Sequence, residues 1–169
     1  MQFTFSQPVP LPVESVVAHL CDEAFQAEKA TRLAARDFAM TVDRRPDGVT
    51  VRTERHLPTV GLPEFVKALV RPVMVVAETE RWDPPEGGSR RGAFEIDVDG
   101  APVRFRGAVG VVPEGRGARL TFEGTLSSTV PLFRGRIEEA SATLVRETME
   151  VEAALLEELS RSGAVPSDR

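Results

Sequence analysis

Tyrosine and asparagine are absent from this sequence, and cysteine occurs once, at Cys21. A lone cysteine cannot form a disulfide within the chain, so no internal cross-link is expected. Cys21 follows Leu20 in a stretch of helical character, and we interpret it as a packing residue. Without tyrosine and asparagine, the polar anchoring of any ligand falls to threonine, serine, arginine, glutamate and backbone groups.

Long apolar runs are missing as well. No stretch approaches the roughly 20 apolar residues of a membrane span, and Met1 to Pro12 has neither the basic flank nor the apolar run of a secretory signal. We therefore expect a cytoplasmic protein without integral membrane association. The hydrophobic content of 41% and the charged content of 28% are typical of a globular chain. The net charge of -5 opposes binding to a phosphate backbone, so nucleic acid is not an expected partner.

The familiar catalytic signatures are also absent. The sequence contains no glycine-rich phosphate or dinucleotide loop, no nucleophile elbow and no zinc-binding helix with paired histidines. A metal site built from histidine and cysteine would require His19, Cys21 and His56 to converge. His19 and Cys21 are two residues apart in a predicted helix and so point to different faces. We predict neither a metal site nor a cofactor.

Proline, glycine and the spacing of apolar residues divide the chain into short elements. Phe94, Ile96 and Val98 alternate with acidic residues, which is the period of a half-buried strand. Asp47 and Gly48 form a turn signal between two further alternating stretches. The expected elements are a strand over 1–6, helices over 12–20 and 22–35, a hairpin over 38–53, a short helix between 57 and 72, a strand over 73–82, three hairpin-linked strands around 94–98, 103–111 and 120–126, and a helix over 136–159.

The last of these elements is the longest. From about Arg136 to Leu159, apolar residues recur at intervals of three and four, and Val145, Met149 and Leu156 widen the apolar stripe. Such a stripe suits a helix that lies against a curved sheet. We predict one α+β domain over 1–161, in which an antiparallel sheet wraps a long C-terminal helix, and a disordered tail over 162–169.

This order of elements resembles the helix-grip fold of the START-like superfamily (SRPBCC), which includes polyketide cyclases and lipid-transfer proteins. The segment 79–82 (TERW), the strand around Phe94 and the segment 130–138, with its Val-Pro-Leu and Ile-Glu steps, resemble a bacterial family of that superfamily, domain of unknown function 2505. The resemblance covers nearly the whole chain. It implies a cavity between the concave face of the sheet and the final helix, holding a hydrophobic small molecule or lipid.

Two groups of residues are candidates for that cavity. The residues of the first group either line a cavity or occupy the same space as a packed core. The sequence leaves both possibilities open, because a core and an apolar site use the same residue types. The short helix between 57 and 72 would be a mobile lid or a permanent cap. The candidate lining residues are Met74, Val76, Phe94, Ile96, Phe105, Phe122, Leu144 and Thr148, and the candidate lid residues are Leu62, Phe65, Val66 and Leu69.

Three side chains are candidates for acid-base chemistry. His56 could act as a general base at a pocket rim, although its charged neighbours favour a solvent-facing histidine. Glu78 and Glu80 share strand parity with Met74, Val76 and Trp82, so burial would raise their pKa values if that face points inward. The other parity of this strand is equally apolar, and we interpret both glutamates as solvated.

The sequence leaves three functional hypotheses. The leading one is a binding or carrier protein for a hydrophobic small molecule. The second is a cyclase, aromatase or hydrolase-like enzyme that uses the same cavity, and it requires His56, Glu78 and Glu80 to open into one pocket. The third is a structural module, such as a homodimer. Arg104 and Arg106 do not bear on this choice, because cross-strand pairing with Glu95 and Asp97 explains them.

Overall fold

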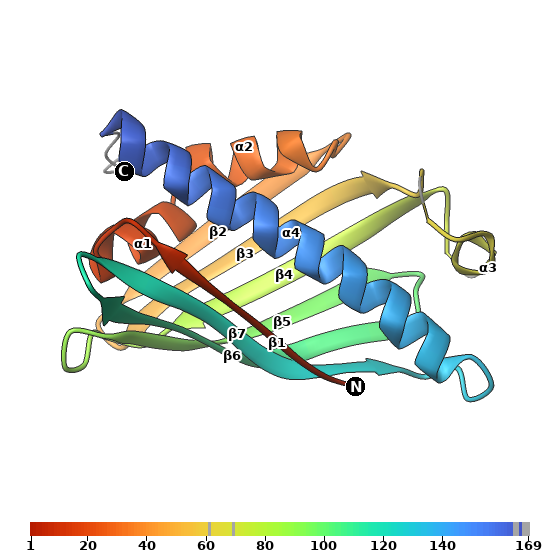
Figure 1. Ribbon diagram of the computed structural model, residues 1–169. Helices are drawn as coiled ribbons and strands as arrows, with labels where there is room; N and C mark the ends of the chain where they lie inside the picture. Colours follow the sequence, from red (N-terminus) through yellow and green to blue (C-terminus); the bar gives the residue numbers. More distant parts are fainter. Residues whose placement is uncertain (61, 69, 164–165, 167–169) are drawn as a thin grey trace.

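The computed structural model describes residues 1–60, 62–68, 70–163 and 166. One antiparallel sheet curves around a long helix, with two short helices at one end and a third at the other (Figure 1). This is the helix-grip arrangement that the sequence predicted. The elements are β1 (Gln2–Val9), α1 (Val13–Leu20), α2 (Glu23–Arg32), β2 (Phe38–Arg45), β3 (Gly48–Pro58), α3 (Glu64–Lys67), β4 (Val73–Trp82), β5 (Arg90–Asp99), β6 (Val103–Glu114), β7 (Gly117–Ser128) and α4 (Arg134–Ser162).

The seven strands follow the order β1-β7-β6-β5-β4-β3-β2. Each strand from β2 to β6 pairs with the next strand along the chain. The turn signals predicted the pairs β2–β3, β5–β6 and β6–β7. The remaining pair joins the two ends of the sequence, because β1 lies beside β7 with Phe5 opposite Phe122. This long-range pair leaves β1 and β2 as the two edges of the sheet.

Local sequence explains where the helices begin and end. The Asp22 carboxylate accepts a hydrogen bond from the Phe25 backbone at 3.1 Å and so caps α2, as the sequence predicted. Helix α4 ends at Gly163, whose φ of 66° is a left-handed conformation that suits glycine. Ser162, where we expected the tail to begin, is therefore still helical, and residues 164–165 and 167–169 of that tail lie outside the described residues.

The short helix between 57 and 72 differs from its prediction. Of the residues that the structure describes in this stretch, only Glu64–Lys67 are helical. Leu57 and Pro58 instead extend β3, because they pair with Met74 and Val73 at the start of β4. Pairing with a neighbouring strand is a tertiary interaction, and it overrides the local apolar spacing.

Helix α4 packs on β1, β6 and β7 and touches α2 near its C-terminal end. Between the helix and the sheet, aromatic rings pack edge to face. The ring centroid of Phe94 lies 4.5 Å from that of Phe105 and 5.5 Å from that of Phe122, and Phe3 lies 5.2 Å from Phe105. Edge-to-face contacts of this kind add to the stabilisation from burial.

The two faces of the sheet have opposite chemistry. On the outer face of β5 and β6, Arg104 pairs with Asp97 at 3.0 Å and Arg106 pairs with Glu95, as expected from the alternation. On β4 our interpretation was wrong. Its buried residues are Met74, Glu78, Glu80 and Trp82, so both glutamates point inward. Alternation determines which residues share a face, but only the curvature of the sheet decides which face is inside.

We call the packed rings of Phe3, Phe94, Phe105 and Phe122 the ring cluster, and we expect it to contribute to the free energy of unfolding. Replacing Phe94 by alanine should lower the free energy of unfolding by about 3–5 kcal/mol, because it removes a buried ring between two others. Phe133→Ala is the matched control, since Phe133 is 44% exposed, and it should change stability by about 0.5 kcal/mol or less. Urea denaturation measures both values. Equal losses in the two variants would show that the ring cluster is not central to the core.

Candidate functional site

A cavity of about 430 Å³ lies between α4 and the concave face of the sheet. Its walls come from strands β3 to β7 and from α4, and α2 and α3 contribute at its two ends. The volume falls within the range of roughly 300–1,000 Å³ that is usual for small-molecule sites. The interior is therefore not completely filled by side chains.

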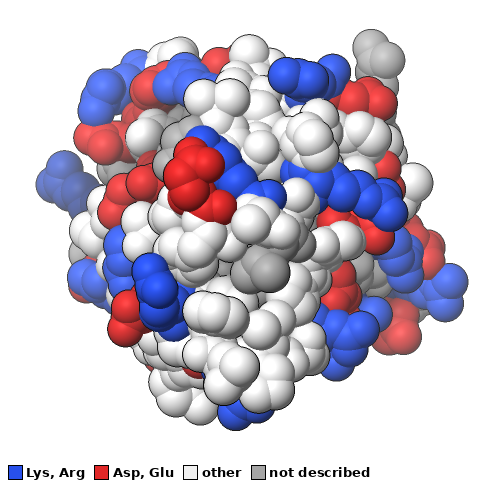
Figure 2. Space-filling view, turned by 90° about the vertical axis from the view of Figure 1, so that its right-hand side faces the viewer, with Lys and Arg blue, Asp and Glu red and all other residues white. Residues whose placement is uncertain are grey.

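The cavity reaches the surface at the end that carries α3. Val60, which lines it, is 85% exposed, and Leu62, Val66 and Val70 line the same end. Figure 2 looks onto this end of the molecule and shows uncharged residues gathered in the centre and lower part of the face, with charged residues around them. An apolar molecule could enter here without crossing a charged barrier.

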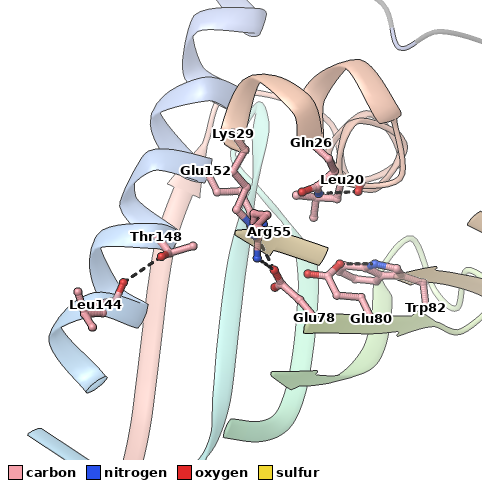
Figure 3. A network of polar contacts seen from close by, with 10 residues as sticks. All are labelled: Leu20, Gln26, Lys29, Arg55, Glu78, Glu80, Trp82, Leu144, Thr148 and Glu152. Carbon is pink, nitrogen blue, oxygen red and sulfur yellow. Dashed lines mark hydrogen bonds and ion pairs between the residues drawn. The ribbon is translucent and has the colours of Figure 1, made fainter. Parts of the chain in front are cut away.

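The inner end of the cavity is charged. Lys29 from α2, Arg55 from β3, Glu78 from β4 and Glu152 from α4 meet there and line the cavity wall (Figure 3). The Lys29 ammonium lies 2.5 Å from the Glu152 carboxylate and 3.8 Å from that of Glu78, and the Arg55 guanidinium donates a hydrogen bond to Glu78. We call these four residues the charge cluster. All four are buried, with at most 8% of their surface exposed.

The charge cluster separates the pKa values of two neighbouring glutamates. Burial alone would raise the pKa of Glu78, but the charges of Lys29 and Arg55 outweigh it and lower that pKa to about 2. Among the described residues no cation forms an ion pair with Glu80, and the charge of Lys29 lowers its pKa less than the other causes raise it. Burial, followed by the charges of Glu78 and Glu152, raises the pKa of Glu80 to about 8, and its carboxyl accepts a hydrogen bond from the Trp82 indole at 2.9 Å.

Most of the predicted lining residues do line the cavity. Phe94 does not, because it packs against other rings in the core. In the predicted lid, Leu62 and Val66 line the cavity, whereas the Phe65 ring packs under the Arg136 guanidinium of α4 at 4.5 Å. Leu69 lies outside the described residues. The predicted residues found in the cavity wall are Met74, Val76, Ile96, Phe105, Phe122, Leu144 and Thr148.

The three candidates for acid-base chemistry do not share a pocket. His56 bonds to Glu54 at 3.0 Å on the outer face of β3, as its charged neighbours suggested. Glu78 lines the cavity but is held as an ion pair with Arg55. Glu80 is buried beside Trp82 and is not part of the cavity wall that the structure describes. The convergence that the enzyme hypothesis requires is therefore absent from the described part of the chain.

Sequence reasoning missed Lys29, Arg55 and Glu152. Each carried a local signal. Lys29 follows Phe25 by four residues and so shares its helix face, and Glu152 lies in the apolar stripe of α4. Arg55 has the strand parity of Val51, which is buried. A charged residue on an apolar face indicates a buried pair, but the partners come from four different elements.

The part of the chain that the structure describes lacks two further features. In that part of the chain, no three His, Cys, Asp or Glu side chains are grouped so that they could hold a metal ion. No helix there is long and apolar enough to cross a bilayer. Cys21 is buried, which raises the pKa of its thiol to about 12 and agrees with its interpretation as a packing residue.

Residues 4–159 match the family described as protein of unknown function (DUF2505). The chain belongs to this family. The DUF2505 chain is also similar to the uncharacterised protein Rv0481c of Mycobacterium tuberculosis, with 26% identity over 113 residues. The match spans 65% of this chain and 65% of that relative's length, so it covers less than two thirds of the relative.

Solved structures show the fold of this DUF2505 chain. TTHA0849 from Thermus thermophilus has a TM-score of 0.62 and 20% identity, covering 97% of this chain and 99% of that one. A START superfamily protein from Mycobacterium smegmatis has a TM-score of 0.57 and 12% identity, covering 96% and 99%. Ara h 8.0201 has a TM-score of 0.56 and 11% identity, covering 96% and 98%. The fold is thus the START/Bet v 1 helix-grip fold.

The opposite pKa shifts of the two glutamates predict how stability depends on pH. The contribution of Glu78 is present above its unfolded pKa of 4.5 and is lost as the pH falls toward about 2. Glu80 has the opposite sign, because its folded pKa of about 8 lies above the unfolded value of 4.5. Its contribution is present below pH 4.5 and is lost as the pH rises through about 8.

The variant Glu80→Gln tests the predicted pH dependence of the Glu80 contribution, since glutamine keeps an oxygen for the Trp82 indole but does not ionise. The free energy of unfolding, measured by urea denaturation from about pH 3 to about pH 9, should fall above pH 4.5 more steeply for the wild type than for the variant, by up to roughly 1.4 kcal/mol per pH unit. Parallel profiles would mean that the Glu80 carboxyl is ionised in the folded protein at neutral pH.

Proposed function

We propose that this DUF2505 protein binds and carries a hydrophobic small molecule or lipid in the cavity between the sheet and α4. The observation that carries the proposal is the cavity itself, a largely apolar space of about 430 Å³. Atoms that line an unfilled apolar space lack packing contacts on that side. An apolar ligand in the space would make those contacts with the lining residues. A START/Bet v 1-like fold is compatible with this role, and the cavity supplies the argument for this chain.

The segment containing α3 is proposed as the lid of the cavity. Leu62 and Val66 lie in the cavity wall at the end where it opens. A four-residue helix with no buried residue of its own has little local stability, so it can move without disturbing the sheet. The contact between Phe65 and Arg136 fastens this segment to the first turn of α4.

Filling the cavity tests the proposal. Ser141 lines it from α4, and Ser141→Trp should weaken binding of the neutral dye Nile red by roughly tenfold or more, because the new ring occupies the space of the ligand. Fluorescence titration measures the affinity, and circular dichroism checks the fold. Native mass spectrometry of protein purified without detergent should also detect a bound apolar molecule in the wild type.

Thr143→Trp is the matched control, because Thr143 is exposed on the same helix. It adds the same ring outside the cavity and should leave the dye affinity unchanged. If both variants bind the dye as the wild type does, the dye is not in the cavity. If the wild type binds neither the dye nor any molecule from the cell, the carrier function is wrong.

The lid proposal has its own test. Arg136→Ala removes an exposed cation–π contact, which is worth about 0.5–1 kcal/mol. Ligand release should then be roughly two- to fivefold faster in a stopped-flow experiment. Arg146→Ala is the control, since Arg146 makes the same kind of contact with Phe3 at 5.1 Å on β1. Equal release rates in the two variants would contradict a lid that is held by Arg136.

A further inference from the structure

The cavity has one polar end, and some of its polar atoms have no partner. Within the described residues, Nε and Nη1 of Arg55 and Oε1 of Glu152 are buried and make no hydrogen bond. Both residues are 1% exposed and both line the cavity. Nearly all buried polar groups in folded proteins are hydrogen-bonded, because an unsatisfied one loses its bonds to water without compensation.

These atoms differ from the other unpartnered ones. Gln26, Thr53, Glu80 and Arg90 also carry buried polar atoms without a described partner, but none of the four belongs to the cavity wall as described. Among the described residues that carry such an atom, only Arg55 and Glu152 also line the cavity. The Arg55 atoms are hydrogen-bond donors, whereas the Glu152 oxygen is an acceptor.

The net charge of the charge cluster determines which ligand group can bind at the inner end of the cavity. Lys29 and Arg55 supply two positive charges, and Glu78 and Glu152 supply two negative charges, so the charge cluster is neutral as a whole. A ligand carboxylate or ammonium would add an unbalanced charge to a buried site, which is strongly unfavourable. The neighbouring Glu80 does not upset this balance near neutral pH, because burial raises its pKa to about 8.

We propose that the cavity takes an amphipathic ligand with an uncharged hydroxyl head, a long-chain or ring alcohol rather than a fatty acid, with the hydroxyl at Arg55 and Glu152. A hydroxyl can accept a hydrogen bond from a guanidinium and donate one to a carboxylate, so it suits both side chains without adding charge. The apolar body of the ligand then extends toward α3. This assignment rests on the proposed function, and it adds the chemical class of the ligand.

Three probes of equal chain length test the head group on the wild-type protein: decanol, decanoate and decyl methyl ether. Displacement of Nile red at neutral pH measures each affinity. Decanol should bind about tenfold or more tightly than either of the others, because the ether lacks the donor and decanoate brings a charge. The ether is the more apolar molecule, so hydrophobicity alone would predict the opposite order for that pair.

A double variant that removes one positive and one negative charge tests whether the preference for decanol depends on Arg55. Arg55→Leu with Glu78→Leu removes the donors of Arg55 together with their counterion, and such buried pairs can often be replaced by apolar residues. The advantage of decanol over the ether should then fall to about twofold or less, with the ether still bound. The control pair Arg106→Leu with Glu95→Leu removes an ion pair from the outer face and should retain the full advantage.

The outcomes separate the two proposals. Equal affinities for the three probes, or tighter binding of decanoate, would overturn the hydroxyl assignment and leave the carrier function standing. If the dye binds but none of the probes displaces it, the hydroxyl assignment is wrong. If the wild type binds neither the dye nor any molecule from the cell, both proposals are wrong. If the double variant does not fold, the ranking of the three probes on the wild-type protein still decides the assignment.

Discussion

The concave face of the sheet is wider than the helix that crosses it, and most features of this molecule depend on that mismatch. Seven strands spaced about 4.8 Å apart span roughly 29 Å, whereas a helix with its side chains is about 10–12 Å across. Helix α4 packs over β1, β6 and β7 and so leaves the concave side of β3, β4 and β5 partly uncovered. Helix α2 covers one end of that area, and the remaining space is the cavity.

The charge cluster stands where α2, α4, β3 and β4 come together. Buried ion pairs add little net stability compared with apolar packing, yet removing one partner leaves a charge uncompensated. The cluster therefore disfavours any docking of α2 and α4 on the sheet in which Lys29 and Glu152 do not meet. The same four side chains form the only charged part of the cavity wall other than Glu147, within the residues described. The same four residues thus join the elements together and line the cavity.

The DUF2505 family and the START/Bet v 1 fold define the architecture without defining a reaction, because one fold can host many activities. Function depends instead on particular side chains. Here the acid-base candidates are separated, since His56 lies on the outer face while Glu78 is engaged by Arg55. The apolar space and its charged inner end are the features on which the proposed binding function rests.

The order of the elements follows from local signals in the sequence, namely the spacing of apolar residues, the cap at Asp22 and the turn glycines. Most of the lining residues that the sequence predicted lie in the cavity wall, since apolar residues of one strand parity share a face. Only the tertiary structure decided that Glu78 and Glu80 point inward and that β1 pairs with β7. A period of two is the same for both faces of a strand, and the counterions of a buried charge lie far away in the sequence, so only the folded chain brings Lys29, Arg55, Glu78 and Glu152 into contact.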